Sequence, residues 1–290
     1  MRIAHLSDLH ALDLTGVSWR RFLNKRLTGG VNLLLKRSHQ HPIWLFDRLI
    51  DAVLATDPDH VVITGDVSNL ALESEFKAVR ARLERLGSPE RVSLIPGNHD
   101  VYTRGAARTR RFEHAFAPWL WPAGADPATA PWPWVKDVAP DVTLVGFCSA
   151  VPRAPFFSSG VVSEAQLARY ARLAAEGRFA GRLVIALVHH NLHKRGLRKD
   201  LTRALRERDR FLAAVSAGGA RVLLHGHTHM AHRFETHGLD VIGSGSSTWL
   251  AAHPDHWARF NLYRIADGQL ADVTVMRHEP AVERFVPWTR

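Results

Sequence analysis

The chain has 290 residues, of which 46% are hydrophobic, so it can bury the core of one α/β domain that carries insertions. Its net charge of +10 favours an anionic partner, and its single cysteine, Cys148, excludes both a disulfide framework and a zinc site built on thiolates. Residues 1–6 are predicted to form a strand, so no secretory signal is expected there. No run reaches the roughly 18 apolar residues of a membrane-spanning helix. We therefore expect a cytoplasmic protein that at most rests on the inner face of a membrane.

Five short apolar runs each end in residues that can bind a metal ion. Residues 2–6 lead into Ser7-Asp8-Leu9-His10, residues 60–64 into Gly65-Asp66, residues 91–95 into Pro96-Gly97-Asn98-His99-Asp100, residues 183–188 into His189-His190, and residues 221–224 into His225-Gly226-His227-Thr228-His229. In open α/β sheets the ligand site lies outside the carboxyl ends of the strands. These five strands are therefore predicted to converge on one polar centre.

Residues 14–46 follow the first strand and contain no Asp or Glu. Apolar residues at positions 19, 22, 23 and 27 have helical spacing. The basic residues interleaved with the apolar ones are Arg20, Arg21, Lys25, Arg26, Lys36 and Arg37. A basic amphipathic helix is typical of contact with an anionic membrane, but it also suits a cap over an active site. Both interpretations stay open for this predicted cap insertion.

The rest of the chain predicts alternating helices and strands in a single domain, residues 1–290. Helices are expected at residues 44–55, 73–86, 112–121, 163–176 and 201–216, and strands at 141–148, 239–242, 260–265 and 271–277. Ser163 and Gln166 have the spacing of a capping box. Residues 118–140 are rich in Pro and Trp, which predicts a rigid loop whose Trp side chains pack against the sheet.

The residue types at the strand ends indicate a dinuclear metal site. Carboxylate, amide and imidazole groups without thiolates suit divalent manganese first, or iron, zinc, cobalt or nickel. The seven candidate ligands are too many for one tetrahedral ion; they are Asp8, His10, Asp66, Asn98, His189, His227 and His229. Two ions that share a bridge can polarise a phosphoryl group and supply hydroxide at neutral pH.

Together these motifs resemble the signature of the calcineurin-like metallophosphoesterases, in order, spacing and strand context, over residues 1 to about 250. The resemblance implies a four-layer α/β fold in which helices flank a central β-sandwich. It implies that Asp8, His10 and His229 bind the first metal ion, that Asp66 bridges, and that Asn98, His189 and His227 bind the second ion. It further implies that His99 protonates the leaving oxygen and that Asp100 orients His99.

Other polar residues near the motifs receive weaker expectations. His190 is expected to support the ligands or to contact substrate, and Arg104 and Arg195 are expected to clamp a phosphate group. His225 is interpreted as a strand-end residue rather than a ligand partner, and His5 as a buried residue with its own partners. The remaining histidines, including His41 and His60, have no ligand spacing and are not expected to bind metal.

The function expected from these features is hydrolysis of a phosphodiester or pyrophosphate bond by metal-bound hydroxide. Residues 22–32 look like an insert of a bacterial group similar to the alternative UDP-diacylglucosamine pyrophosphohydrolases of lipid A synthesis, which favours a lipid-linked nucleotide as substrate. A cyclic-nucleotide phosphodiesterase is the alternative. A nuclease and a non-catalytic scaffold rank lower, and no nucleic-acid partner is expected because no aromatic stacking array accompanies the basic residues.

Overall fold

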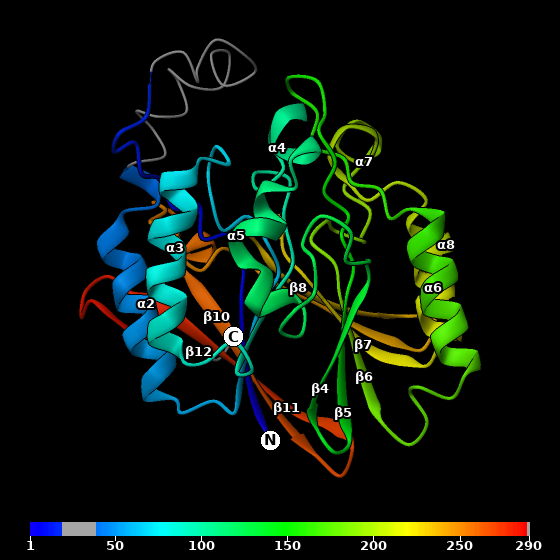
Figure 1. Ribbon diagram of the computed structural model, residues 1–290. Coiled ribbons are helices and arrows are strands. Elements are labelled where there is room, and N and C mark those ends of the chain that lie inside the picture. Colours follow the sequence, from blue (N-terminus) through cyan, green and yellow to red (C-terminus); the bar gives the residue numbers. More distant parts are fainter. Residues whose placement is uncertain (19–38, 289–290) are drawn as a thin grey trace.

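The computed structural model describes residues 1–18 and 39–288, and it contains two six-stranded sheets (Figure 1). The first has the order β12-β11-β10-β1-β2-β3, and the second the order β4-β5-β6-β7-β9-β8. The strands of the first sheet are β1 (Arg2–Leu6), β2 (His60–Ile63), β3 (Val92–Leu94), β10 (Arg259–Ala266), β11 (Gln269–Glu279) and β12 (Arg284–Trp288). Those of the second are β4 (Trp134–Ala139), β5 (Val142–Gly146), β6 (Leu183–Leu187), β7 (Ala220–His225), β8 (Ala231–Thr236) and β9 (Leu239–Ser244).

Helices cover the outer face of each sheet. The helices are α2 (Ile43–Ala55), α3 (Glu73–Leu86), α4 (Arg104–Arg108), α5 (Arg111–Leu120), α6 (Glu164–Ala175), α7 (Leu197–Arg203) and α8 (Arg208–Ala217), with a 3-10 turn at Pro254–His256. Figure 1 shows α2, α3 and α5 on one flank and α6 and α8 on the other. The expected four-layer α/β fold is confirmed. No helix in the described part of the chain is long and apolar enough to cross a membrane.

The side chains of β6 point alternately to the two faces of its sheet, which explains why the protein has two hydrophobic cores. Leu183, Ile185 and Leu187 belong to the large core that includes β1 and the first helical layer, whereas Val184 and Ala186 pack with α6 and α8 in a second core. Because successive strand side chains point to opposite faces, an uninterrupted apolar strand joins two cores. The central strands of both sheets are thereby buried on both sides.

The Pro- and Trp-rich region is more regular than expected. Helix α5 covers most of the helix expected at 112–121 and continues through Pro118, with non-helical backbone at Phe116, so the predicted loop does not begin at residue 118. Residues 134–139 form β4, which lies at the edge of its sheet, where proline-rich neighbours are tolerated. The expected packing role of the tryptophans is confirmed, because Trp119, Trp121 and Trp134 are buried.

Two other local predictions are wrong. The helix expected at 201–216 is split into α7 and α8, because the intervening chain is extended at Ala204 and Leu205 pairs with Gly160. The capping box at the start of α6 does not form, since the Gln166 side chain instead bonds to both backbone groups of Cys148. The basic residues of the predicted cap, between 20 and 37, lie outside the described residues.

Candidate metal centre

The carboxyl ends of the parallel strands meet at one edge of the sandwich. In the first sheet Leu6 pairs with Ile63, and Ile63 pairs with Leu94, so the residues that follow all leave from the same side. In the second sheet Leu187 is level with Leu224. The two sheets are joined at this edge, where the amide of His227 donates to Asp8 Oδ2 at 2.9 Å. The strand topology therefore places the predicted ligands together.

Four of the predicted ligands form the first group. His229 Nε2 lies 2.9 Å from His10 Nε2 and 3.2 Å from Asp8 Oδ1. His10 Nε2 lies 3.8 Å from Asp8 Oδ1 and 3.9 Å from Asp66 Oδ2. Separations of this size between donor atoms are those of ligands around one ion whose bonds are about 2.0–2.2 Å long. This group contains the three residues expected at the first ion and the expected bridge.

The second group shares Asp66 with the first. His189 Nε2 lies 3.4 Å from Asp66 Oδ2, 3.3 Å from Asn98 Oδ1 and 3.3 Å from His227 Nδ1. His189 Nδ1 donates to the Thr64 carbonyl at 2.7 Å, which leaves the lone pair on Nε2. Such a bond on the far nitrogen is the usual way of fixing the tautomer of a metal-ligating imidazole. Asp66 Oδ2 thus faces both groups, as a bridging carboxylate must.

The donor atoms fit divalent cations. Asp8 Oδ1 is buried and accepts no hydrogen bond from any described residue, whereas Asp8 Oδ2 accepts from Ser7 Oγ and the His227 amide. One oxygen of this carboxylate is thus held in place and the other is available to a cation. A buried carboxylate oxygen without a donor is costly unless a cation offsets its charge. The residues present therefore suit a pair of metal ions.

The electrostatics of Asp66 also favour the binding of cations. Burial alone would raise the pKa of the Asp66 carboxyl, but His189, His99 and His10 lie close enough to hold that pKa well below its ordinary value. Burial alone would lower the pKa of His189, whereas the charge of Asp66 raises it to about 9. Asp66 is therefore an anion that attracts positive charge at the point where the two groups meet.

The backbone at the centre is strained. Five of the seven predicted ligands have a positive φ: Asp8, His10, Asp66, His227 and His229, with values between 46° and 73°. Residues other than glycine rarely adopt this left-handed region, and such strain concentrates at functional sites. The glycines beside the ligands meet two different needs. Gly65 itself has a φ of 94°, whereas Gly97 and Gly226 lie too close to the ligands to carry a side chain.

Gly97→Ala tests this close approach. A β-carbon at Gly97 would lie 2.1 Å from Asp66 Oδ1, so the bridging carboxylate must shift. We expect unfolding to become easier by about 1–3 kcal/mol, as for other overpacked sites, and manganese binding to weaken, measured by thermal unfolding and by calorimetric titration. Gly105→Ala is the control, because the nearest atom to its β-carbon is 3.8 Å away. Equal metal affinity in both variants would contradict the argument.

His99 lies beside the ligands, but its support differs from the expectation. Its Nδ1 donates to the Asn69 carbonyl at 2.7 Å, and its ring stacks on Tyr102. The prediction that Asp100 orients His99 is wrong. The Asp100 carboxylate points toward the backbone instead, where it accepts from the amides of Gly97, Val67 and Ser68 and from the Ser68 hydroxyl. Asp100 therefore holds the loops that carry Asp66 and Asn98.

His190 supports the site from behind rather than facing substrate. It is buried, its Nδ1 accepts from Ser149 Oγ at 2.7 Å, and its Nε2 donates to the Ser158 carbonyl at 2.9 Å. Both ring nitrogens are used, so the predicted substrate contact is wrong and the supporting role is retained. Arg104, exposed at the start of α4, and Arg195, half-buried ahead of α7, remain predicted phosphate contacts.

Two histidines behave as the sequence predicts, and one does not. His5 is buried with both ring nitrogens bonded, to Tyr263 Oη and Thr64 Oγ1, and His225 is buried at the end of β7. His41, by contrast, joins the first ligand group. Its ring centre is 4.8 Å from that of His10, and the ligand atoms of His10, His41 and His229 lie within 4.8 Å of one another.

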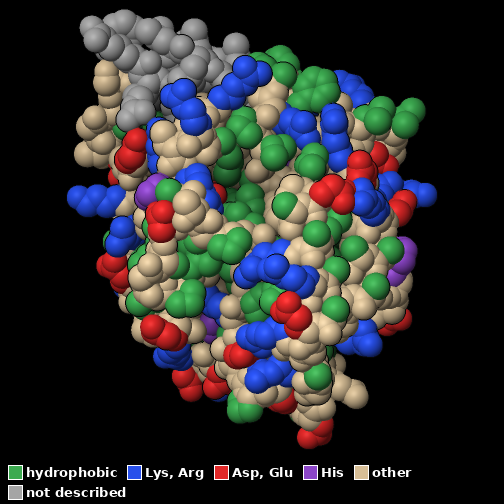
Figure 2. All heavy atoms as spheres, turned by 45° about the vertical axis from the view of Figure 1, so that its right-hand side comes forward, with side chains coloured by type: hydrophobic (Ala, Val, Ile, Leu, Met, Phe, Trp, Pro, Cys, Tyr) green, Lys and Arg blue, Asp and Glu red, His purple; other side chains and the backbone are tan. Residues whose placement is uncertain are grey.

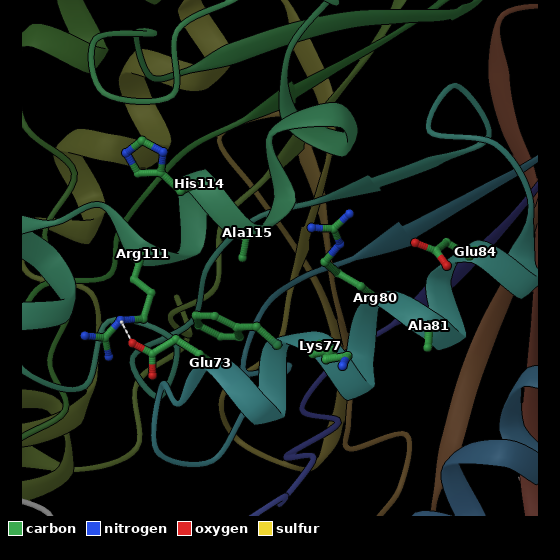
Figure 3. A pocket seen from close by; sticks show the side chains of 9 residues that line it. Glu73, Lys77, Arg80, Ala81, Glu84, Arg111, His114 and Ala115 are labelled. Atoms are coloured by element: carbon green, nitrogen blue, oxygen red, sulfur yellow. Dashed lines mark ion pairs between the residues drawn. The ribbon is translucent and has the colours of Figure 1, made fainter. Parts of the chain in front are cut away.

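A surface cavity of about 610 Å³ lies elsewhere, between α3 and α5 (Figure 3). Within it, Arg111 pairs with Glu73 at 3.1 Å. The residues that line it are Glu73, Phe76, Lys77, Arg80, Ala81, Glu84, Arg111, His114 and Ala115. Its charged side chains are of both signs, and none of the predicted ligands lines it. This cavity on the helical layer is separate from the candidate metal centre.

Comparisons with known proteins agree with this geometry. The model of the calcineurin-like phosphoesterase family matches residues 1–231. Among solved structures, a dimetal phosphatase from Danio rerio has a TM-score of 0.62 at 14% identity, with 95% of each chain covered. A purple acid phosphatase from yellow lupin has a TM-score of 0.56 at 11% identity, with 99% of this chain and 52% of that chain covered. No curated protein sequence matches the chain.

Proposed function

Since the chain belongs to the calcineurin-like phosphoesterase family, whose members are metal-dependent hydrolases, we propose that it cleaves a phosphodiester or pyrophosphate bond with the help of two divalent cations, manganese first among them. The observation that carries this proposal is the position of Asp66 Oδ2, which faces His10 on one side and His189 on the other. Two cations bound there would polarise the phosphoryl group and make a water molecule acidic.

The residues around the ligands have separate tasks in this proposal. Asp8, His10, Asp66 and His229 would hold the first cation, and Asp66, Asn98, His189 and His227 the second. His99 would donate a proton from Nε2 to the leaving oxygen, because Nδ1 is engaged with the Asn69 carbonyl. Arg104 and Arg195 would contact phosphate oxygens that the cations do not reach.

An apolar-basic rim supports an amphiphilic substrate. We give this name to the exposed Phe156, Phe157, Leu197 and Leu201 together with Lys194, Arg198, Lys199 and Arg203. Phe156 is 88% exposed and has a φ of 71°, so a strained backbone presents an aromatic side chain to solvent. Figure 2 shows hydrophobic and Lys or Arg side chains interleaved along the top of the molecule, where α4 and α7 lie in Figure 1.

The rim is connected to the metal centre by short contacts. His190, which bonds to the Ser158 carbonyl, has its ring centre 4.7 Å from that of His227. The Ser158 amide in turn donates to Thr202 of α7, next to Leu201. These contacts place residues 158 and 202, beside the rim, close to the second ligand group, which supports an apolar chain that lies against the rim while the phosphates reach the ligands.

We accordingly favour a lipid-linked nucleotide such as UDP-diacylglucosamine, cleaved at its pyrophosphate while the acyl chains remain in the inner leaflet. Basic side chains near an anionic bilayer contribute about 1 kcal/mol each, and exposed aromatic side chains anchor at its surface. The resemblance to pyrophosphohydrolases rests on residues 22–32, and most of the predicted membrane contact on residues 14–46, so both lie largely outside the described residues. A cyclic nucleotide needs no apolar rim, and it remains the alternative.

The test is a manganese-supplemented comparison of substrates. UDP-diacylglucosamine, cyclic AMP, bis-p-nitrophenyl phosphate and single-stranded DNA are offered separately, and products are identified by mass spectrometry. We expect UMP and an acylated sugar phosphate from the first, with kcat/KM well above that for cyclic AMP. A preference for cyclic AMP would replace the lipid substrate with the alternative, and cleavage of none of them would refute the proposed activity.

Phe156→Ser with Phe157→Ser separates the rim from the chemistry. We expect KM for the lipid-linked substrate to rise about tenfold, because two exposed aromatic groups lose apolar contact worth about 1 kcal/mol or more. Activity on bis-p-nitrophenyl phosphate should stay unchanged, and sedimentation with anionic liposomes should weaken. Leu54→Ser is the control, because Leu54 is an exposed apolar residue of α2 outside the rim. An unchanged KM and unchanged sedimentation would show that the rim contacts neither substrate nor membrane.

A further inference from the structure

His41 brings a third imidazole to the first ligand group. The ring centres of His10 and His41 are 4.8 Å apart at an interplanar angle of 62°, and those of His41 and His229 are 5.9 Å apart at 83°. His41 is only 6% exposed. Three imidazoles gathered from the end of β1, from the chain before α2 and from the turn after β7 are more than the first ion was expected to have.

The hydrogen bonds of His41 determine which nitrogen faces its neighbours. Thr248 Oγ1 donates its single proton to the Leu9 carbonyl at 2.7 Å, so toward His41 Nδ1, 2.9 Å away, this hydroxyl acts as an acceptor. Nδ1 therefore carries the proton, and Nε2 carries the lone pair. His189 is fixed in the same way by the Thr64 carbonyl. A bond from the far nitrogen is the pattern that orients metal-ligating imidazoles.

The backbone beside His41 is anchored to the loop that follows β9. The Gln40 carbonyl accepts from the Leu250 amide at 2.7 Å, and Pro42 follows His41 immediately before α2 begins. Thr248 also belongs to the segment in which Ser246 Oγ donates to the Asp8 carbonyl at 2.8 Å. One loop, residues 246–250, thus positions the backbone of a predicted ligand and the side chain of His41 together.

We propose that His41 Nε2 is a further ligand of the first metal ion, an inference that rests on the proposed dinuclear function. With Asp8, His10, Asp66 and His229 it would give that ion five protein ligands, four of them already within 3.9 Å of a neighbour. Three imidazoles and two carboxylates suit a divalent transition ion in an expanded coordination sphere. His41 lies at the described end of the predicted cap, so residues near 41 would contribute to the first site.

The experiment measures manganese binding without substrate. Apo-protein is titrated calorimetrically with manganese alone, and bound metal per chain is counted by mass spectrometry after dialysis. We expect two sites in the parent protein. In His41→Ala the second site should persist, whereas the Kd of the first should rise about 10- to 100-fold or more, the loss seen when supporting residues of metal sites are removed. His237→Ala, an exposed histidine, should match the parent protein.

A second variant and a spectroscopic measurement distinguish loss of a metal ligand from loss of folding. Thr248→Val keeps the imidazole but removes its hydrogen-bond partner, so it should weaken the first site less than His41→Ala. The cobalt-loaded parent protein and His41→Ala should differ in their visible absorption, because a nitrogen ligand is lost. Unchanged affinity and an unchanged cobalt spectrum in His41→Ala would overturn the assignment, even if turnover falls. A parent protein that binds fewer than two ions would overturn the proposed function instead.

Discussion

Replacing Asp66 by alanine is expected to abolish metal loading at both sites and, with it, activity. In the described part of the chain, Asp66 Oδ2 is the only carboxylate oxygen paired within 4 Å with both His10 and His189. Loss of the cations would remove several kcal/mol of transition-state stabilisation, which corresponds to a fall in kcat/KM of about 1,000-fold or more. Metal content after dialysis and hydrolysis of bis-p-nitrophenyl phosphate measure the two effects.

Asp66→Asn distinguishes loss of the bridging carboxylate from loss of folding. Asp66 Oδ1 accepts from the His99 amide at 2.7 Å, and an asparagine side-chain oxygen can keep that bond. The remaining amide nitrogen cannot coordinate a cation, so we expect a folded protein that has lost the bridge. Asp209→Ala, an exposed carboxylate on α8, is the control for charge removal. A fully active and metal-loaded Asp66→Asn would show that the two sites do not share this carboxylate.

Much of the centre could be predicted because its residues follow the strands directly. Asp66 comes three residues after Ile63, and His189 two residues after Leu187, so the topology of parallel strands brings them to one edge. Seven candidate ligands could be named in this way, and the donor atom of each lies within 4 Å of that of at least one other. A candidate ligand that follows its strand within a few residues can thus be predicted from the local sequence.

His41 could not be found by the same reasoning. His39 and His41 have the same spacing as His227 and His229, but no apolar strand ends beside them. The position of His41 depends on Thr248, 207 residues away along the chain. Contacts of that kind are created by the fold and leave no local pattern. The segment that precedes His41 stands out by its charge and amphipathicity, which describe a surface rather than a ligand.

The error at Asp100 has a related cause. The resemblance to the calcineurin-like metallophosphoesterases implied that Asp100, the residue after His99, orients that imidazole. The actual partner of the imidazole is the backbone carbonyl of Asn69, and a carbonyl group is present at every residue. Burial and the charge of Asp66 raise the pKa of Asp100 to about 7, and its hydrogen bonds to the Gly97 and Ser68 amides and to the Ser68 hydroxyl offset part of that rise. Side-chain identity therefore predicts ligands better than it predicts the groups that orient them.

His99→Ala should keep both cations and lose turnover. A positioned general acid contributes about 10²- to 10⁴-fold, so kcat should fall by that amount for a substrate whose leaving oxygen needs a proton. The loss should be much smaller for bis-p-nitrophenyl phosphate, because p-nitrophenolate leaves without protonation. His114→Ala, an exposed histidine on α5, is the matched control.

The metal content of His99→Ala decides between two roles for this side chain. His99 offers a ring nitrogen within 4.8 Å of the ligand atoms of His10 and Asp66, a distance that would also suit a ligand. Its Nδ1 bond to Asn69 and its stacking on Tyr102 fix the ring equally well for either role. A proton donor can be removed without loss of metal, whereas a ligand cannot. Two bound ions combined with a leaving-group-dependent loss of kcat would therefore identify the acid, and a missing ion would make His99 a ligand.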